Sequence, residues 1–351
     1  MTKKLNALIK PLLALTIALV AAWLILAVAG YNAGDAFGAL WKASFKNLKT
    51  VGTMLNRTSP ILFTGLSVAV ALQANMMNIG AEGQFLGGAI VATVIGIYCD
   101  GLPGPALIAL MAVGGALGGA IVGAIPGFLK ARMNVSEVII TIMLNYVFQY
   151  VVEFLVRGPL KDTSQGEPQS WKIAEQAYLP YLLEGTKLHM GFFLGVAVAI
   201  LVFILLFKTY IGFELRAVGF NLTAAQTTGI NAKSTMVFSM VLAGALAGIG
   251  GAIEIGNNHY LIDTLSPGYG FTAIAVSALA GNNPIGVIFT AMIFGFLSAG
   301  STAMQRSAGI SATFVQVFQG LIVIFVAIAA VRSVKKKRLG KEAAEAKGGS
   351  K

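Results

Sequence analysis

The sequence predicts an all-α polytopic membrane protein with about ten transmembrane helices. Hydrophobic residues make up 56% of its 351 residues, charged residues make up only 11%, and the mean hydropathy is +0.79. Soluble domains carry roughly 25% charged residues, so this chain could not cover a water-facing surface. Apolar runs close to the roughly 20 residues that cross a bilayer also recur along its length.

Ten spans fit these apolar runs best, and one of them is short. We expect them near 11–30, 59–77, 80–98, 104–128, 137–156, 190–208, 234–253, 269–281, 284–303 and 312–332. This gives a transmembrane domain at 11–332, between an amino-terminal segment at 1–10 and a basic tail at 333–351. No small-residue cleavage site follows the first run closely, which favours a retained helix over a signal peptide.

Basic residues gather at both ends of the chain. Lys3, Lys4 and Lys10 precede the first run, and the tail KKKRLGKEAAEAKGGSK holds seven basic and two acidic residues. The positive-inside rule places both ends in the cytoplasm, which requires an even number of spans. The loop at 208–233 is then cytoplasmic, and the loops at 31–58 and 157–189 are external. Basic ends of this kind indicate contact with membrane lipid, not with nucleic acid.

Glycine clusters inside two of the expected spans. VGGALGGAIVGAIPG (113–127) and LAGALAGIGGAIEIG (242–256) both place Gly and Ala three and four residues apart. Small residues allow helices in lipid to approach closely, so both stretches predict tight helix packing. The two stretches also resemble each other, either because the chain contains two repeated halves or because any two Gly/Ala-rich helices look alike.

No motif predicts an enzyme. The chain lacks a GxxxxGK[ST] phosphate loop, an HExxH metal motif and a GxSxG nucleophile elbow. Cys99 is the only cysteine, so there is no disulfide framework and no cysteine metal site. We therefore expect no catalytic residue, no metal and no cofactor in this chain.

The stretch ALQANMMNIGAEGQFLGGA (71–89) places a carboxylate, Glu82, beside apolar runs. A carboxylate at the bilayer centre costs at least roughly 2.5–3.5 kcal/mol, so it usually faces a cavity or a partner. Asn75, Asn78 and Gln84 lie around it. Either this region lines a substrate pathway, or residues 78–84 form a short turn between two spans. Asn145, in the middle of another expected span, is a further pathway candidate, and an interhelical hydrogen bond is the alternative role.

The cytoplasmic segment 208–234 is too long for a plain connection. It contains Glu214 and Arg216 and then NLTAAQ, in which Asn221 is a plausible N-cap for a short helix. Loops of this length usually have a function. The segment either docks on a soluble partner or forms an interfacial helix without one. Farther along, GNNP (281–284) marks a turn after a short span.

Four motifs occur in the order and spacing of one known family. They are NIGAEGQFLGGAI, LKARMNVSEVIITIMLNYV, RAVGFNLTAAQTTGI and FTAIAVSALAGNNPIGVIFTAMIFGFLSAG. From about residue 50 to 332, the chain resembles permease subunits of bacterial ABC importers of the ribose, simple-sugar and branched-chain amino-acid type. It is most similar to the subgroup that takes up nucleosides with a basic-membrane-protein lipoprotein as receptor. Met77 stands where this subgroup commonly has Phe.

This resemblance implies a type II ABC importer-like fold of ten helices in the bacterial plasma membrane. A second permease subunit, a paralogue in this subgroup, would share a central pathway above two ATPase subunits, which hold ATP and Mg. A substrate-binding lipoprotein would deliver the solute. The NIGAEGQ region would lie near the pathway. The residues that match the segment docking on the ATPase, with the preceding acid, are Glu214, Arg216, Gly219, Asn221, Ala224, Ala225, Gly229 and Ile230.

Two other functions remain open at this stage. A permease for ribose-like sugars would belong to the same family. A stand-alone, ion-coupled transporter would need ionisable residues at several mid-span positions. The main acidic residues in or beside the expected spans are Glu82, Glu137, Glu153 and Glu254, and three of them lie near predicted ends.

Overall fold

The computed structural model describes residues 20, 23–28, 30–182, 186, 188–308 and 320, and within them the chain is helical apart from turns and three isolated β-bridges. The helices are α2 (Ala33–Phe45), α3 (Leu48–Gln73), α4 (Ala81–Tyr98), α5 (Gly104–Met133), α6 (Glu137–Arg157), η1 (Glu175–Ala177), α7 (Gly191–Lys208), α8 (Tyr210–Phe220), α9 (Leu222–Thr227), α10 (Ala232–Asn258), α11 (Tyr269–Leu279) and α12 (Pro284–Ala308). The chain forms two compact units, residues 44–298 and residues 1–43 with 299–351. The residues predicted to line the pathway and to contact the ATPase all lie within the unit 44–298.

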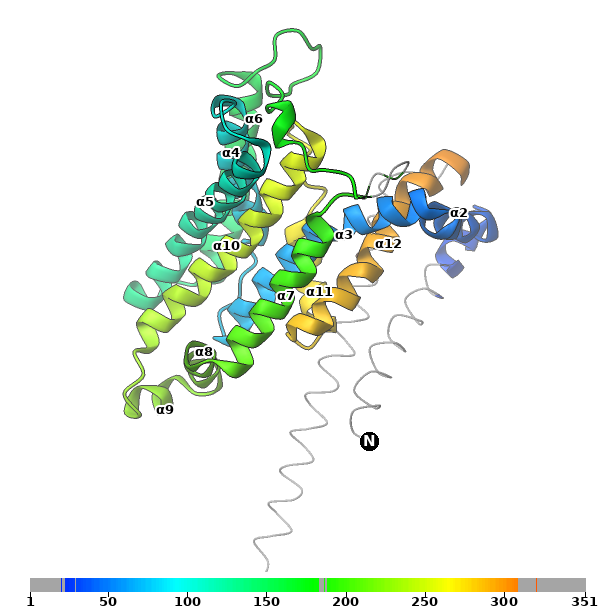
Figure 1. The fold of residues 1–351 in the computed structure, drawn as a ribbon. Coiled ribbons are helices and arrows are strands. Elements are labelled where there is room, and N and C mark those ends of the chain that lie inside the picture. Colours follow the sequence, from blue (N-terminus) through cyan, green and yellow to red (C-terminus); the bar gives the residue numbers. More distant parts are fainter. Residues whose placement is uncertain are drawn as a thin grey trace, which may run out of the picture. The chain divides into compact units, whose positions relative to one another are not determined.

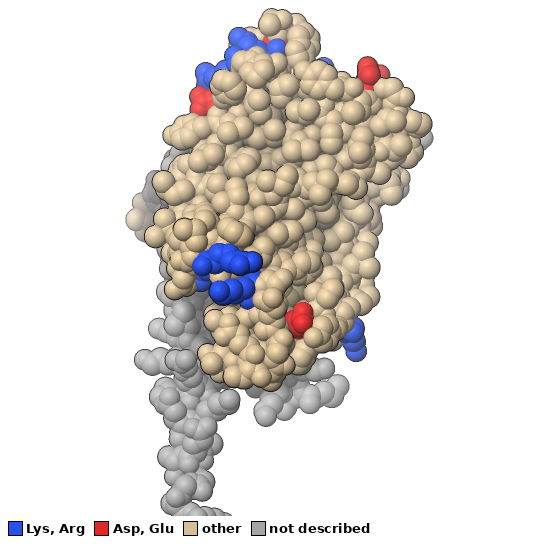
Figure 2. All heavy atoms as spheres, turned by 90° about the vertical axis from the view of Figure 1, so that its left-hand side faces the viewer, with Lys and Arg blue, Asp and Glu red and all other residues tan. Residues whose placement is uncertain are grey.

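Six of the described helices are long and apolar enough to cross a membrane. They are α4, α5, α6, α7, α10 and the Pro284–Gln305 part of α12, while α11 is apolar but shorter. One face of the molecule shows a broad uncharged band between charged side chains at its two ends, as a bilayer-spanning protein requires (Figure 2). The expected span 59–77 lies largely within α3. The spans 11–30 and 312–332 fall mostly outside the described residues, so the count of ten remains a prediction.

The segment 31–58, expected as a loop, is instead mostly helical. It forms α2 and the first eleven residues of α3. Asn47 caps α3 with its side chain, which accepts a hydrogen bond from the Thr50 N–H, while the Thr50 hydroxyl oxygen accepts one from the Asn47 N–H. This capping box starts the helix well before the apolar run from which the span was predicted. The prediction of an external segment did not anticipate these helices, because it followed hydropathy alone.

The two glycine-rich stretches pack against each other as the antiparallel helices α5 and α10. A Cβ added to Gly119 would overlap the carbonyl oxygen of Gly244, and one added to Gly248 would overlap that of Gly115. The helix backbones are therefore in direct contact. The prediction of tight packing is confirmed, whereas the internal repeat remains a prediction.

The segments 158–182 and 209–231 lie at opposite ends of the helix bundle (Figure 1). The first contains η1 and pairs with residues after α10 through the bridge between Gln169 and Ile262. The second folds into α8 and α9, with Asn221 as the N-cap of α9. The short helix predicted from NLTAAQ is confirmed.

Candidate functional site

Two helices begin inside the bundle, and their amino termini meet there. α4 starts after the non-helical segment 74–80, and α11 starts after the non-helical segment 259–268. The backbone N–H of Gly270, in the first turn of α11, donates to the Glu82 carboxylate over 2.6 Å. A side chain on Gly270 would overlap the backbone of Glu82, so no other residue fits this approach.

This arrangement explains why the chain places a carboxylate at this position. Glu82 lies in the first turn of α4 and faces the first turn of α11. Helix amino termini carry partial positive charge and unpaired N–H groups, which stabilise an anion. The Ser266 hydroxyl also hydrogen-bonds Glu82. The glutamate is only 5% exposed, so these contacts supply the partners that a buried carboxylate requires.

Asn78 and Gln84 form a second buried polar cluster beside Glu82. Asn78 Nδ2 donates to Gln84 Oε1 over 2.8 Å, and Gln84 Nε2 donates back to Asn78 Oδ1 over 3.1 Å. Ser67 of α3 completes the cluster, because its hydroxyl oxygen accepts from Asn78 Nδ2 over 3.2 Å. All three side chains are fully buried. The cluster therefore fixes the start of α4 against α3.

Asn145 ties α6 to the same region. Its Oδ1 accepts from the Gly83 N–H over 2.8 Å, and its Nδ2 donates to the Ile79 carbonyl over 3.0 Å. Asn75, in contrast, is exposed and adopts a left-handed conformation, with φ at 56°, just after α3 ends. The structure thus brings together Asn78, Glu82, Gln84 and Asn145 but not Asn75. We call this buried region, where α3, α4, α6 and α11 meet, the polar junction.

Residues 209–231 project from one end of the bundle, and we call them the coupling segment after the docking role expected from the sequence. Asn221 Oδ1 accepts from the Ala224 N–H over 3.1 Å, and Gly229 has a left-handed φ of 87° that ends the α9 turn. Ala225 is buried and clusters with Val218 and Ala232, and Ile230 packs against this cluster. Most of the remaining α9 surface is exposed.

Two charged residues of α8 are bound within the segment itself. Arg216 Nε donates to the Gly212 carbonyl over 3.2 Å, and its guanidinium lies 5.1 Å from the centre of the Phe207 ring. Glu214 hydrogen-bonds the Tyr210 hydroxyl, which raises the pKa of that tyrosine. The Arg216–Phe207 contact holds α8 against the end of α7, whereas the Glu214–Tyr210 bond lies within α8.

Gly219 connects the coupling segment to the polar junction. A side chain on Gly219 would overlap the carbonyl oxygen of Gln73, the last residue of α3. Gln73 Nε2 in turn donates to the Asn282 carbonyl, in the turn between α11 and α12, over 2.9 Å. Gln73 directly precedes the linker that leads to Asn78. The two groups of residues singled out from the sequence are therefore adjacent through the end of α3.

The sequence analysis missed several residues of the polar junction and of the coupling segment. Ser67 and Gly270 each hydrogen-bond a residue of the polar junction, but a serine or glycine does not stand out in an apolar run. Phe220, beside α9, is 90% exposed. A large aromatic residue directly before the polar stretch NLTAAQ was a signal that could have identified it.

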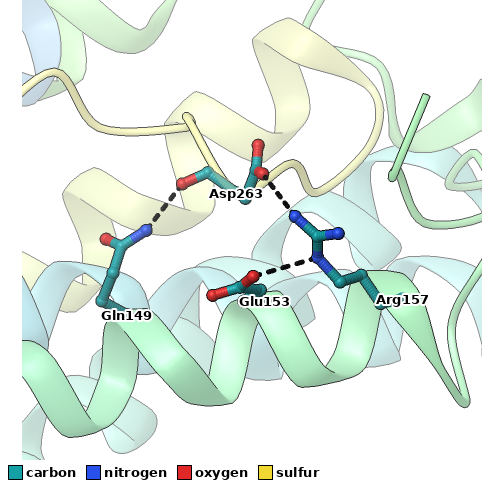
Figure 3. Close-up of polar contacts among 4 residues, drawn as sticks. All are labelled: Gln149, Glu153, Arg157 and Asp263. Carbon is teal, nitrogen blue, oxygen red and sulfur yellow. Dashed lines mark hydrogen bonds and ion pairs between the residues drawn. The ribbon is translucent and has the colours of Figure 1, made fainter.

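A four-residue polar cluster at the opposite end of the bundle was also missed. Gln149, Glu153 and Arg157 project from α6 toward Asp263, which follows α10 (Figure 3). Gln149 Nε2 donates to the Asp263 carbonyl over 2.8 Å, and Arg157 pairs with Glu153 and Asp263 at 3.1 and 3.8 Å. Within the described part of the chain, no group of three His, Cys, Asp or Glu residues could hold a metal ion.

Comparison with known proteins gives one family and several relatives. The family described as "Branched-chain amino acid transport system / permease component" matches residues 50–327. The guanosine ABC transporter permease protein NupP of Bacillus subtilis is 35% identical, covering 93% of this chain and 95% of the relative. The nucleoside ABC transporter permease protein NupB of Lactococcus lactis is 32% identical, covering 93% of each chain. The glucose ABC transporter permease protein TsgB13 of Haloferax volcanii is 32% identical, covering 90% of this chain and 86% of the relative.

The first two organisms each contain a second relative with a similar name. NupQ of B. subtilis is 26% identical over 246 residues, covering 68% of this chain and 77% of the relative. NupC of L. lactis is 27% identical over 258 residues, covering 71% of this chain and 80% of the relative. In both organisms the second protein is the more distant one.

Proposed function

Because the chain belongs to the family of permease components of branched-chain amino acid transport systems, we propose that it is the membrane subunit of an ATP-driven importer of nucleosides. The observation that carries this proposal is the similarity to NupP and NupB over almost the full length of all three chains. The chain itself is a multi-pass membrane permease and not an enzyme. ATP and Mg would be bound by a separate ATPase subunit, and a surface lipoprotein would deliver the solute.

The geometry of the coupling segment supports attachment to an ATPase. Its exposed parts, α9 and Phe220, stand away from the bundle, while Ala225 and Ile230 anchor it. A fully exposed aromatic ring at the polar end of a membrane protein is the kind of residue that a partner buries. This end would face the cytoplasm, with both chain termini on the same side.

The contacts of Gly219 suggest how movement of the ATPase subunits would reach the polar junction. Closure of the ATPase subunits would push α8, and α8 abuts Gln73 with no side chain between them. Displacement of Gln73 would act on the linker 74–80 and, through Asn282, on the turn after α11. The starts of α4 and α11 at the polar junction would then shift together. Asn78, Glu82, Gln84 and Asn145 would serve to keep that junction intact beside the pathway.

The second permease subunit would be a paralogue. B. subtilis and L. lactis each have two proteins that match this chain, both named as permeases for the same substrate class. This chain is more similar to one member of each pair, NupP and NupB. A heterodimer in which this chain takes the place of NupP or NupB fits that pattern.

A simple-sugar importer is the second candidate. The glucose permease of H. volcanii is nearly as similar to this chain as the nucleoside permeases are. A stand-alone, ion-coupled transporter receives no support, because the family consists of permease components that work within larger systems.

Uptake by cells tests both candidates. Cells that carry the intact transport genes would be compared with cells that lack only this chain, using labelled guanosine, ribose and glucose. Uptake of guanosine that requires this chain and the ATPase supports the proposal. Uptake of a sugar without guanosine would replace it with the second candidate, and uptake that persists without the ATPase would overturn both.

A further inference from the structure

The exposed face of α6 differs in chemistry from the exposed faces of its neighbours. Among the six described candidate spans, α6 is the least buried. In the middle of α5 the large exposed residues are aliphatic, as at Val113, Leu117 and Ile121, while Phe128 and Met133 are exposed near its end. On α6 they include Tyr146 and Tyr150, which are 59% and 66% exposed. Apart from Tyr98, the last residue of α4, these are the only tyrosines in the six helices.

Tyrosine is a poor residue for the lipid-facing centre of a span. Its hydroxyl prefers the membrane–water boundary, where tyrosine is enriched. Tyr146 lies at the middle of a helix of 21 residues, and Tyr150 lies one turn farther along. The aliphatic middle of α5 suits lipid chains, whereas α6 presents two tyrosine hydroxyls among exposed apolar residues such as Met143 and Phe154.

The two tyrosines continue into the polar cluster of Figure 3. Counting from Tyr146, Tyr150, Glu153 and Arg157 stand at i+4, i+7 and i+11, which places all four on one side of the helix. Glu153 and Arg157 are partly exposed and paired, and Arg157 also reaches Asp263. A single stripe thus runs from an ion pair at the end of the helix to aromatic rings at its centre.

We infer that this stripe of α6 forms one wall of the translocation pathway, with Tyr146 and Tyr150 stacking against the planar base of the permeating nucleoside. This inference rests on the proposed function for the identity of the solute. Aromatic rings bind any base through its π-face, and the phenol hydroxyls can bond polar edges or the sugar. The opposite wall would come from the second permease subunit, which would keep lipid away from the tyrosines.

The inference reassigns the pathway within the fold. Asn78 and Gln84 are fully buried and bonded to each other, so in this conformation they have no exposed surface to offer a solute. The exposed polar groups near the centre of a span belong to α6. The polar junction lies directly behind them, since Asn145 precedes Tyr146 in the chain and binds the start of α4.

Cysteine labelling of the intact transporter tests the wall itself. Cys99 is the only native cysteine, so Cys99→Ser provides a background in which Tyr146→Cys, Tyr150→Cys and Leu117→Cys can be compared. A charged, membrane-impermeant thiol reagent should label both α6 positions in open membranes at least tenfold faster than Leu117→Cys, which lies on the aliphatic face of α5. Guanosine should slow labelling on α6 only. Labelling on α6 as slow as at Leu117 would show that lipid covers this face and would overturn the inference.

Uptake kinetics test the stacking role. Tyr146→Phe and Tyr150→Phe keep a ring and should change the KM for guanosine less than threefold. Tyr146→Leu and Tyr150→Leu keep bulk without a ring and should raise KM tenfold or more at equal membrane levels. Unchanged KM in the Leu variants, with wild-type uptake intact, would overturn stacking. If the wild type carries no guanosine, the proposed substrate fails, while the labelling result still decides whether α6 lines an aqueous path.

Discussion

The carboxylate of Glu82 and the backbone N–H of Gly270 are joined by a hydrogen bond of 2.6 Å, although 188 positions separate them in the chain. The bond links the first turn of α4 to the first turn of α11. Since both helices begin inside the bundle, each needs a partner for its unpaired N–H groups. One side chain therefore holds together two helices that could otherwise separate, and its charge is what makes it suitable.

Replacement of Glu82 by Ala should destabilise the transporter more than replacement by Gln. Ala leaves the Gly270 N–H unpaired in a buried place, which costs about 1–3 kcal/mol. Gln keeps an oxygen acceptor but loses the charge that the two helix termini favour. We expect thermal unfolding of the purified complex to occur at the highest temperature for the wild type, lower for Glu82→Gln and lowest for Glu82→Ala. Equal unfolding temperatures for Ala and wild type would show that the bond does not stabilise the junction.

Replacement of Gly219 by Ala should impair transport through the coupling segment. The added methyl group would meet the Gln73 carbonyl oxygen, and backbone on both sides cannot give way cheaply. Overpacking of this kind costs about 1–3 kcal/mol and would displace α8 from the end of α3. We expect guanosine uptake to fall at least fivefold while the protein still reaches the membrane.

The matched control for this change is Gly101→Ala. Gly101 has open space around the position of its Cβ, so the same chemical change should leave uptake within twofold of wild type. ATP hydrolysis by the assembled transporter should continue in Gly219→Ala without proportionate uptake. Wild-type uptake in Gly219→Ala would contradict the proposed route from α8 to Gln73.

Features of the fold and of the candidate site could be predicted from the sequence where the interacting residues lie close together in the chain. The glycine stripes of α5 and α10 and the Asn221 cap are local patterns, and both predictions are confirmed. The early start of α3 depends on Asn47 and Thr50, which are also local, but the hydropathy signal outweighed them. The partners of Glu82, Ser266 and Gly270, lie almost 190 residues away, so only the fold identifies them. Tyr146 and Tyr150 could be read in the sequence, but their exposure could not.

Replacement of Gly119 by Val should disrupt the packing of α5 on α10. Gly119 lies against the carbonyl oxygen of Gly244, and even one methyl group would overlap that atom. Close van der Waals approach is a main source of helix association in lipid, so separation of the backbones should lower stability by at least about 1–3 kcal/mol. Leu117→Val, an exposed position on the same helix, should behave as wild type in thermal unfolding. The hypothesis of close helix contact would be lost if the two variants unfolded at the same temperature.

His189 should make the stability of the protein depend on pH. Its ring is buried, its Nδ1 accepts from the Gly191 N–H over 3.0 Å, and burial lowers its pKa from 6.5 to about 4. The folded state therefore holds a neutral ring at pH values where the unfolded chain already binds a proton. The unfolded state binds more protons between pH 6.5 and 4, so the free energy of unfolding falls as the pH drops through this range, by about 3 kcal/mol in all. Above pH 6.5 this contribution is fully present and constant.

The variant His189→Gln isolates this effect because a glutamine side chain does not titrate. It should be less stable than wild type at pH 7.5, since it loses the Nδ1 acceptor, and the difference should shrink or reverse toward pH 4.5. Thermal unfolding of the detergent-solubilised complex at a series of pH values measures how the stability of each of the two proteins changes with pH. His259→Gln serves as the comparison: burial lowers the pKa of His259 as well, but this ring is only half-buried and stacks on the Tyr178 ring, so the pH dependence should change less. If wild type and His189→Gln lose stability in parallel between pH 6.5 and 4.5, other groups cause the pH dependence and His189 does not.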